Sequence, residues 1–340
     1  MNLRLLLIVL LNVFISEIDA QNDSLVLNNG NLIEGELKGM RQDVTTFKTD
    51  YSDSDFKIKW SEIKTLSTKT EFLVTLKNGS RYNGSLKSNS DGDIAISTVS
   101  GEVLAITNLN SIVLLVVVKS DFWSKLDASV SVGYNFIKSD NQSQLSLRSA
   151  LSYNAKRWSL SSNYNQIRTT RDEVFSVRRM DAGLVYKYYM KKNWFTLSEV
   201  SFLSNTEQNI DLRTLAKLGM GKYILRSNKM YWAVQSGVSY NNESFMVSGS
   251  DGNNNSGEGF LGTELNIYNI GDLTLLTRVV AYPSFTEKGR FRVDSRFDLK
   301  YDLPLNFYIN FGITLNHDNQ PVQTTNKTDY VLQSTIGWDL

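Results

Sequence analysis

From Trp123 to Leu340, apolar and polar residues alternate in segments of about ten residues that are separated by turn-forming residues. Alternation places successive side chains on opposite faces of a β-strand, and a strand that crosses a bilayer needs ~9–11 residues. The sequence therefore predicts an all-β fold in which residues 119–340 form a twelve-stranded antiparallel transmembrane β-barrel. The predicted strands begin near Trp123, Gln142, Trp158, Val174, Trp194, Leu212, Met230, Gly259, Leu273, Arg290, Asn306 and Asp329.

The charges in segment 290–301 indicate which face of the strands points outward. Phe291, Val293 and Phe297 share one face of this segment, and six charged residues share the other. A basic residue on the lipid-facing side costs ~2–4 kcal/mol at the midplane of the bilayer. A slip of one residue would turn all six charges outward, at a cost on the order of 10 kcal/mol. We therefore predict an apolar outer face and a polar interior, and segment 306–316 follows the same pattern.

The predicted connections alternate between tight and long. Tight turns follow the second, fourth, sixth, eighth and tenth strands, whereas most other connections are longer, notably Asn242–Glu258 and His317–Thr328. Outer-membrane barrels have short periplasmic turns and longer extracellular loops. This pattern places both ends of the barrel domain, and the segment that precedes it, in the periplasm.

Tryptophan positions favour the same orientation. Five of the six tryptophans fall at predicted strand ends on the side of the tight turns. The indole ring prefers the bilayer interface because it has an apolar body and a polar N–H group. We predict a periplasmic aromatic girdle that consists of Trp123, Trp158, Trp194, Trp232 and Trp338.

The last predicted strand, Tyr330–Leu340, resembles the C-terminal signal that the outer-membrane insertion machinery recognises. Trp338 and Leu340 are apolar at the third-last and last positions, as in that signal. Gln333 fits its polar position, whereas Gly337 lies two residues later than the usual glycine. The resemblance implies two partners, the insertion machinery and outer-membrane lipid.

Residues 21–118 contain an internal repeat with an offset of 49 residues. The sequence Leu-Asn-Asn-Gly at 27–30 returns as Leu-Lys-Asn-Gly at 76–79, and a second glycine follows five residues later in each copy. Asn-Gly predicts a hairpin, because a type I′ turn needs positive φ at both central residues, and the second glycine suits a sharp bend. Each copy is predicted to form a small bent barrel that resembles SH3-like or Sm-like folds. The two units, about 21–69 and 70–118, are expected to pack together because each buries little core.

Residues 1–20 have the organisation of a secretory signal peptide. Arg4 precedes the apolar run Leu5–Leu11, and the small residue Ala20 follows. The run is shorter than the ~20 residues that a membrane-spanning helix needs, so we predict cleavage after Ala20. An N-terminal anchor or a core strand is the alternative. The longest apolar run elsewhere is Ile112–Val118, so a membrane-embedded mature chain would have to be a closed barrel.

Composition removes several classes of function. The chain has no cysteine and a single histidine, His317. This excludes disulfide scaffolds, thiolate metal sites and cysteine catalysis, and it disfavours a conventional triad. Without residues 1–20 the chain has 35 basic and 33 acidic residues. That balance predicts no nucleic-acid partner.

Three weak candidates for chemistry remain. An outer-membrane phospholipase is a precedent for an enzyme with twelve strands, but no serine lies at a suitable spacing from His317 to complete its His-Ser pair. Segment 50–55 offers oxygen ligands for a cation, with a solvated loop as the alternative. Segment 251–255 resembles a calcium loop, but Gly262 stands where the bidentate acid belongs. We predict no catalytic residue, no metal site and no cofactor.

Several segments in both parts of the chain resemble the YdiY-like family of salt-induced outer-membrane proteins. They are 49–58 (Thr-Asp-Tyr-Ser-Asp-Ser-Asp-Phe-Lys-Ile) with Trp60, 76–79 and 82–84, 131–133 (Ser-Val-Gly), 209–213 (Asn-Ile-Asp-Leu-Arg) and 219–221 (Gly-Met-Gly). The resemblance covers essentially the whole mature chain. It implies an outer-membrane barrel and no defined chemistry, since the function of this family is largely unassigned.

Alternation places seven basic and five acidic side chains in the interior of the predicted barrel. They are Arg148, Arg179, Arg213, Lys217, Arg278, Arg292 and Arg296 with Asp181, Glu199, Glu264, Asp294 and Asp298. A twelve-stranded barrel is wider than the eight-stranded kind that side chains fill. The charges therefore form either a salt-bridge network that plugs the lumen or rings that line a narrow water path.

The sequence predicts a non-enzymatic outer-membrane barrel with a structural or envelope-stress role. Its N-terminal repeats would then be a docking module for a periplasmic protein partner. The alternative is a narrow channel for small solutes with a slight anion preference, which Arg213, Lys217, Arg292 and Arg296 would set.

Overall fold

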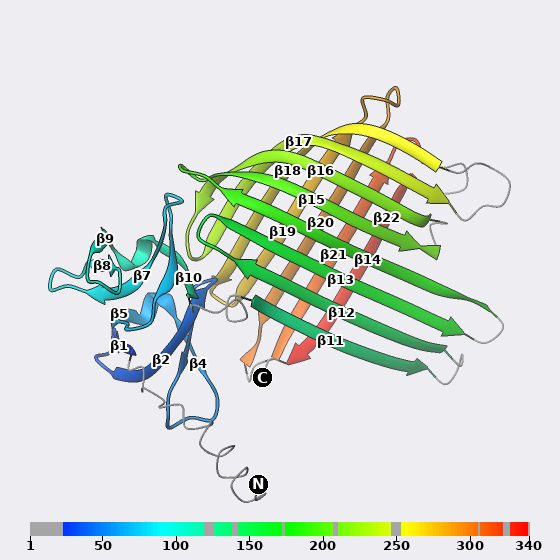
Figure 1. The fold of residues 1–340 in the computed structure, drawn as a ribbon. Coiled ribbons are helices and arrows are strands. Elements are labelled where there is room, and N and C mark those ends of the chain that lie inside the picture. The colour runs from blue at the N-terminus through cyan, green and yellow to red at the C-terminus, as the bar shows by residue number, and fades with distance from the viewer. Residues whose placement is uncertain are drawn as a thin grey trace, which may run out of the picture.

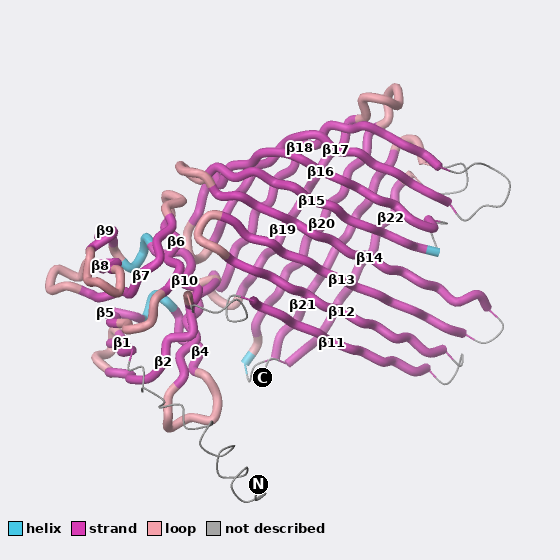
Figure 2. Tube along the Cα trace, in the orientation of Figure 1, coloured by secondary structure: helices cyan, strands magenta, loops and turns pink. Residues whose placement is uncertain are grey.

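The computed structural model describes residues 23–118, 126–137, 142–171, 174–206, 210–245, 253–304, 307–321 and 327–338. The predicted signal peptide and Trp123 lie outside these residues. Most of the described chain is β-strand, in one sheet of ten strands and one of twelve (Figures 1 and 2). In the described segments, no helix combines the length and the apolar character that crossing a membrane requires.

In the twelve-stranded sheet, each strand pairs antiparallel with the next one along the chain. The strands are β11 (Leu126–Ile137), β12 (Gln142–Asn154), β13 (Trp158–Arg171), β14 (Val174–Tyr189), β15 (Trp194–Asn205), β16 (Ile210–Arg226), β17 (Met230–Phe245), β18 (Asn253–Ile270), β19 (Leu273–Pro283), β20 (Phe291–Asp302), β21 (Phe307–Asp318) and β22 (Thr328–Trp338). The sheet curls, so that β20–β22 pass behind the green strands β12–β14 (Figure 1). Pairing within the described residues runs from β11 to β22 without a ladder between those two strands.

Six strands begin at the predicted residue, and β20, β21 and β22 begin within one residue of it. The largest difference is β18, which begins at Asn253 and not at Gly259, while β17 extends to Phe245. The prediction of a long connection over Asn242–Glu258 was therefore wrong. Asn and Gly favour turns locally, but here Asn253 pairs with Ser244 and the ladder continues from there.

The connections define two ends of this sheet. At the short-turn end, the connections after β12, β14, β16, β18 and β20 are two to four residues long. At the opposite, long-loop end they reach nine residues, in segment 319–327, although the connection from β13 to β14 has only two. The predicted short turns are therefore all short, but only the connections after β17, β19 and β21, with seven, seven and nine residues, are longer than they are.

Apolar side chains cover the outer face of the curled sheet. Phe297 and Phe311 are 40% and 51% exposed, whereas Arg292, which points to the opposite face of β20, is 4% exposed. Phe297 pairs with Ile313 of β21, so the two strands share one register of outward apolar residues. This is the register that the charges of segment 290–301 predicted.

The ten-stranded sheet contains the N-terminal residues, and its elements recur after 49 residues. The first half has β1 (Asp23–Leu27), β2 (Leu32–Arg41), β3 (Val44–Lys48), β4 (Phe56–Lys59), the 3-10 helix η1 (Trp60–Glu62) and β5 (Ile63–Ser67). The second half has β6 (Phe72–Leu76), β7 (Arg81–Ser88), β8 (Ile94–Ser97), β9 (Val103–Thr107), η2 (Leu109–Ser111) and β10 (Ile112–Val117). A Cβ at Gly35 or at its equivalent Gly84 would collide with the carbonyl oxygen of Lys48 or Ser97. The repeated second glycine therefore permits the close approach of neighbouring strands.

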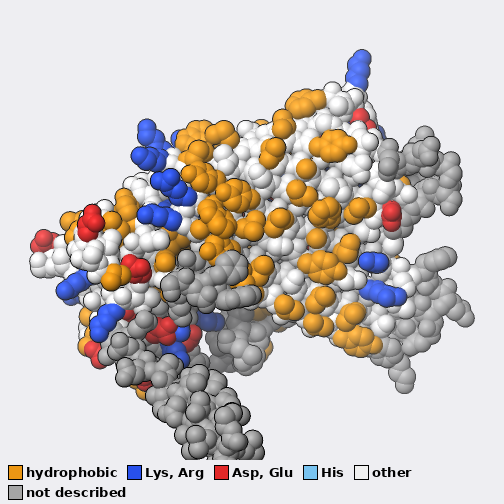
Figure 3. All heavy atoms as spheres, in the orientation of Figure 1, with side chains coloured by type: hydrophobic (Ala, Val, Ile, Leu, Met, Phe, Trp, Pro, Cys, Tyr) orange, Lys and Arg blue, Asp and Glu red, His pale blue; other side chains and the backbone are white. Residues whose placement is uncertain are grey.

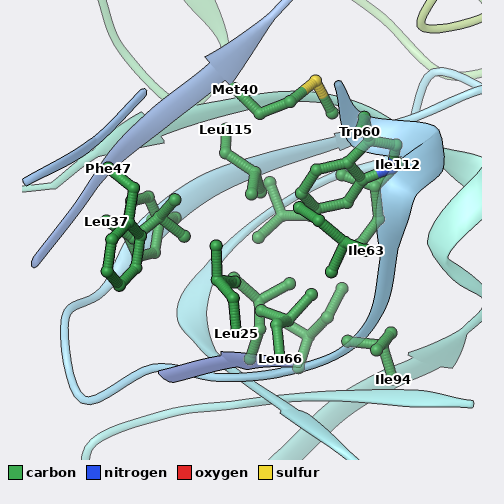
Figure 4. Packing of buried hydrophobic residues seen from close by; sticks show 14 of the residues in the cluster. Leu25, Leu37, Met40, Phe47, Trp60, Ile63, Leu66, Ile94, Ile112 and Leu115 are labelled. Atoms are coloured by element: carbon green, nitrogen blue, oxygen red, sulfur yellow. The ribbon is translucent and has the colours of Figure 1, made fainter. Parts of the chain in front are cut away.

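The two halves share one hydrophobic core (Figure 4). β5 of the first half pairs with β7, and β10 of the second half pairs with β2. Trp60 is 1% exposed, and its indole N–H donates to the carbonyl oxygen of Leu109, its own equivalent in the repeat, at 2.9 Å. Strand exchange between the halves allows both to bury their apolar residues together, which neither could do alone at this size.

Candidate functional site

The inner face of β15–β19 carries a packed apolar cluster. It consists of Phe195, Leu197, Leu215, Ala233, Phe260, Val280 and Tyr282, each less than 9% exposed. Side chains as buried as these have protein atoms on all sides. This part of the interior is therefore filled by side chains.

Glycines on the neighbouring strands make room for the two phenylalanines of the cluster. A Cβ at Gly219 or Gly237 would lie 2.6 or 2.8 Å from the ring of Phe260, and a Cβ at Gly221 would collide with the ring of Phe195. The ring of Phe195 covers the backbone of the adjacent strand β16, and the ring of Phe260 on β18 reaches over β17 to β16. The fit explains why β16 and β17 have glycine at inward positions.

Three predicted interior charges form a buried group beside this cluster. Lys217 Nζ lies 2.7 Å from Glu199 Oε1, and Arg278 Nη2 lies 3.5 Å from Glu199 Oε2. The Lys217 side chain is only 2% exposed, whereas that of Arg278 is 45% exposed. Lys217 is thus held by its partner inside the protein, while Arg278 also reaches solvent.

A larger charged cluster fills the long-loop end of the same side. Arg292 makes a bidentate contact with Glu258, at 3.0 Å from Nε and 2.7 Å from Nη2. Arg290 Nη2 lies 2.6 Å from Asp318 and 3.4 Å from Glu243, and Arg213 Nε lies 2.7 Å from Glu243. The side chains of Glu243 and Glu258 are 1% and 0% exposed. Every charge in this cluster is compensated by a neighbour, as burial requires.

Arg213 and Arg292 were predicted from the sequence as interior residues, but their partners Glu243 and Glu258 were not. Both glutamates lie in the segment that was interpreted as a long loop. The alternation Ser239-x-Asn241-x-Glu243 continues that of β17 and could have placed Glu243 on the inner face. The partner of each arginine depends on strand pairing, which a single strand does not reveal.

The inner face of β11–β13 differs from that of β15–β19. Its side chains are small or polar, and they are exposed to solvent: Ser129, Gly133, Arg148, Ser161 and Asn163. Arg296, on the inner face of β20, is likewise exposed, at 69%, although it lies 2.6 Å from Asp298. This side of the interior is lined by hydrogen-bonding groups that water can reach.

The other predicted interior residues are spread over β14, β18 and β20. Arg179 Nε is 3.7 Å from Asp181, and both are about one-third exposed. Glu264 accepts a hydrogen bond from the hydroxyl group of Tyr231. Asp294 lies opposite Val280 in the β19–β20 ladder. The twelve predicted charges therefore share one face but do not form a single site.

Four of the five predicted girdle tryptophans lie in the described chain, all at the short-turn end. Trp158 and Trp194 begin β13 and β15, Trp232 lies near the start of β17, and Trp338 ends β22. Trp158 stacks on Tyr153 with ring centroids 5.0 Å apart. The indole N–H of Trp232 donates to Thr263 Oγ1 at 2.9 Å.

The ten-stranded sheet docks on the short-turn end through the tips of two hairpins. In the β2–β3 turn, Gln42 O accepts a hydrogen bond from Asn269 at 2.7 Å, and Asp43 accepts one from Asn228 at 2.5 Å. In the β6–β7 turn, the carbonyl oxygen of Lys77 accepts from Asn193 at 2.9 Å. The two tips thus contact three separate short turns of the twelve-stranded sheet (Figures 1 and 2).

The docking contact extends to inward-pointing side chains at the short-turn end of β14 and of the packed side, β15–β19. Arg81, at the start of β7, places its guanidinium carbon 4.3 Å from the centroid of the inward ring of Tyr189. Tyr223 lies next to Phe195 and Tyr231, with ring centroids 5.1 and 5.6 Å apart. Tyr189, Tyr223 and Tyr231 therefore form an aromatic floor beneath the N-terminal sheet.

Backbone strain coincides with this contact. Among the described residues, the non-glycine residues with positive φ are Gln42, Asp43, Lys192, Asn193 and Asn269. Four of them lie in the hairpin turns that meet at the docking surface, and Asn269 lies at the end of β18, beside the β18–β19 turn. Strained backbone persists where surrounding contacts hold it in place, which marks this surface as specific.

Burial changes the acidity of two groups at the docking surface. Asp43 is 1% exposed, and this burial raises the pKa of its carboxyl group, although Lys229, with Nζ at 3.6 Å, acts in the opposite direction. Burial also lowers the pKa of the Arg81 guanidinium group. Both shifts reflect the loss of water where the two sheets meet.

Comparison with known proteins gives a family. In the described residues there is no group of three or more His, Asp or Glu side chains that could hold a metal ion. A search of curated proteins found no match. The family described as "Protein of unknown function, DUF481" matches residues 130–339, from β11 to the end of β22, and this is consistent with the resemblance to the YdiY-like proteins. Because the match extends over more than half of the chain, the protein belongs to the DUF481 family.

Proposed function

We propose that this protein is a non-enzymatic outer-membrane β-barrel in which β11 meets β22 and the N-terminal sheet lies in the periplasm. The observation that carries the proposal is the apolar outer face. Leu218, Leu261 and Ile336 are 62%, 64% and 74% exposed. Apolar side chains are spread over the wall of the curled sheet (Figure 3). The strand register places the charges described above on its inner face. A soluble monomer rarely exposes so much apolar surface, whereas lipid would cover it.

The N-terminal sheet then acts as a periplasmic cap of the barrel. It contacts three short turns and an aromatic floor, and the packed side behind that floor is filled by side chains. A barrel that is half filled and partly capped suits a structural role in the envelope. The association with salt or envelope stress rests on the resemblance to the YdiY-like proteins alone.

The membrane location is tested by replacing one outward and one inward residue. Phe297→Arg puts a basic residue at the middle of the outer face, at a cost of ~2–4 kcal/mol in lipid, while Thr314→Arg puts the same residue on the inner face of β21. We expect Phe297→Arg to lower the amount of folded protein in the outer-membrane fraction and Thr314→Arg to leave it near wild type. Recovery of the processed wild-type protein in soluble form without detergent would contradict the proposal.

A narrow channel is the second candidate, and the exposed side of the interior supports it. Arg278 and Arg296 have 45% and 69% exposed side chains, whereas Glu199 is 11% exposed. Water in this region would therefore meet more positive than negative charge, which gives a weak preference for anions. Lys217 and Arg292 are too buried to contribute, contrary to the residues that the sequence favoured.

Single-channel recordings in planar bilayers test this candidate. We expect a small conductance with weak anion preference, which the double variant Arg148→Gln/Arg296→Gln shifts toward cations. Arg168→Gln, on the outer face, is the matched control and leaves selectivity unchanged. Conductance no higher than background, or clear cation selectivity of the wild type, would exclude the channel.

A further inference from the structure

Two arginines face each other on the outer surface near the long-loop end. Arg168 of β13 and Arg178 of β14 are direct partners in the β13–β14 ladder. They share their faces of these strands with Leu160, Leu184 and Tyr186, which are 36%, 47% and 37% exposed. Both guanidinium groups therefore point outward and not into the interior, and both residues are exposed.

Neither arginine has a carboxylate partner among the residues that the structure describes. The guanidinium group of Arg178 makes a weak contact, from Nη2 to Met180 Sδ at 3.9 Å. Like charges directly opposite each other in a ladder repel and destabilise it. Neighbours on the same outer rows are neutral hydrogen-bonding groups: Tyr164 donates to Gln166 at 2.8 Å. Within the described part of the chain, the pair is therefore a concentration of positive charge without a counter-ion.

The position of Arg168 and Arg178 along the barrel axis indicates which group supplies their counter-ion. Arg168 follows Trp158, at the short-turn end of the same strand, by ten residues. Ten residues rise ~33 Å along a strand, or ~25 Å along the barrel axis at a tilt of ~40°. The apolar band of an outer-membrane barrel is about 25 Å tall. If Trp158 lies at the periplasmic interface, Arg168 and Arg178 lie at the level of the outer-leaflet headgroups.

We propose that Arg168 and Arg178 bind the phosphate group of an anionic lipid in the outer leaflet. Guanidinium groups bind phosphate oxygens through paired, charge-assisted hydrogen bonds, and two of them on adjacent strands would offer one phosphate several donors. The phosphate would also relieve the repulsion between the two arginines. In Figure 3, basic side chains gather at both ends of the visible wall and leave its middle apolar. This inference rests on the proposed membrane location.

Native mass spectrometry of the full-length protein in detergent tests the site. The probe is phosphatidic acid, with phosphatidylcholine of the same acyl chains as the zwitterionic comparison. We expect wild type to retain phosphatidic acid preferentially, and Arg168→Gln/Arg178→Gln to lose one retained lipid with a 10- to 30-fold weaker affinity, since each basic residue near the surface contributes ~1 kcal/mol. The matched control is Arg148→Gln/Arg296→Gln, which removes two exposed arginines from the inner face and is expected to bind as wild type does.

Three results would overturn the proposal. The first is unchanged phosphatidic acid binding in the outer-face variant, and the second is an equal loss in the inner-face control. The third is displacement of the lipid by an equimolar amount of inorganic phosphate, which would indicate a site for a soluble anion. Failure of the membrane proposal gives a different result, since the wild-type protein would then stay in solution without detergent.

Discussion

The two sides of the curled sheet have the same alternation of residues but opposite interiors. On β15–β19 the inward positions hold aromatic rings, glycines and ion pairs, and Phe195, Phe260 and Glu258 are 3% exposed or less. On β11–β13 the inward positions hold serine, asparagine and glycine, and Ser129 and Asn163 are exposed. Alternation therefore determines which residues point inward, while the size of those residues determines whether the interior is filled.

This difference separates two tasks within one sheet. The packed side supplies a rigid wall to which the N-terminal sheet attaches, because its turns follow directly from strands that the cluster immobilises. The other side leaves polar surface in contact with water, where exposed arginines meet solvent. A structural role depends on the first side and a channel on the second, so substitutions can test them separately.

The largest expected effect comes from breaking a buried ion pair on the packed side. Glu258→Gln keeps the shape of the side chain but removes the closest charge to Arg292, whose side chain is 5% exposed. The other acidic neighbour of Arg292, Glu243, is 3.9 Å away and is already paired with Arg213 and Arg290. An uncompensated buried charge costs about 3–5 kcal/mol. We expect a loss of this size in the free energy of unfolding, measured by urea titration in detergent with tryptophan fluorescence.

The matched substitution on the solvent-exposed side is Asp298→Asn. Its partner Arg296 is 69% exposed at a distance of 2.6 Å, and such pairs contribute less than about 1 kcal/mol. Equal losses for Glu258→Gln and Asp298→Asn would show that the two sides do not differ in burial.

A smaller effect is expected when one inward-facing glycine on either side of the curled sheet is replaced by alanine. In Gly237→Ala the new Cβ would collide with the carbonyl oxygen of Leu218 and lie 2.8 Å from the ring of Phe260, whereas in Gly133→Ala it meets chiefly the hydroxyl of Ser146 at 2.6 Å. The hydroxyl can rotate away, but the backbone cannot. We expect Gly237→Ala to lower the free energy of unfolding by about 1–3 kcal/mol and Gly133→Ala by much less. The same titration measures both variants, and a larger loss in Gly133→Ala would contradict the comparison.

The sequence predicted the strands of both sides but not the contrast between them. Gln142, Trp158 and Leu273 begin strands as predicted, because each follows a turn signal and opens an alternating segment. Asn253 was assigned to a loop because its turn propensity was considered without its partner Ser244. Arg292 and Lys217 were placed on the correct face, but their burial depends on partners on other strands, Glu258 on β18 and Glu199 on β15. Alternation within one strand carries no such information.

The contact between the N-terminal sheet and the twelve-stranded sheet could not be predicted from the sequence either. The repeat in residues 21–118 predicted hairpins at its Asn-Gly sequences, and the β6–β7 hairpin does form at Asn78-Gly79. Gly79 has positive φ but Asn78 does not, so the predicted type I′ turn was wrong. The β2–β3 turn instead uses Gln42 and Asp43, which have positive φ without being glycine. Their conformation is stabilised by turns that lie more than 180 residues later in the chain. Local propensity disfavours such a turn, and only the contact with the other sheet accounts for it.

The smallest effect concerns the pH dependence of that contact. Because burial raises the pKa of Asp43 in the docked state, the docked sheet binds this proton more tightly than an undocked one. Docking is therefore strongest below the ordinary carboxyl pKa of ~4 and weakens as the pH rises through the raised pKa. Asp43→Asn resembles the protonated form and tolerates positive φ, so it is expected to remove this dependence.

Amide hydrogen exchange of the β2–β3 turn measures the effect as a protection factor, which corrects for the intrinsic pH dependence of exchange. In wild type, protection should fall between pH 4 and pH 8, by less than about fivefold because Lys229, 44% exposed, compensates part of the charge. In Asp43→Asn it should be constant over that range. Asp91→Asn, in the exposed β7–β8 turn at the equivalent end of the other half, is the control and should keep the wild-type profile. Protection that rises with pH in wild type would mean that the ion pair with Lys229 outweighs burial, and the docking surface would then be held together by charge and not by the exclusion of water.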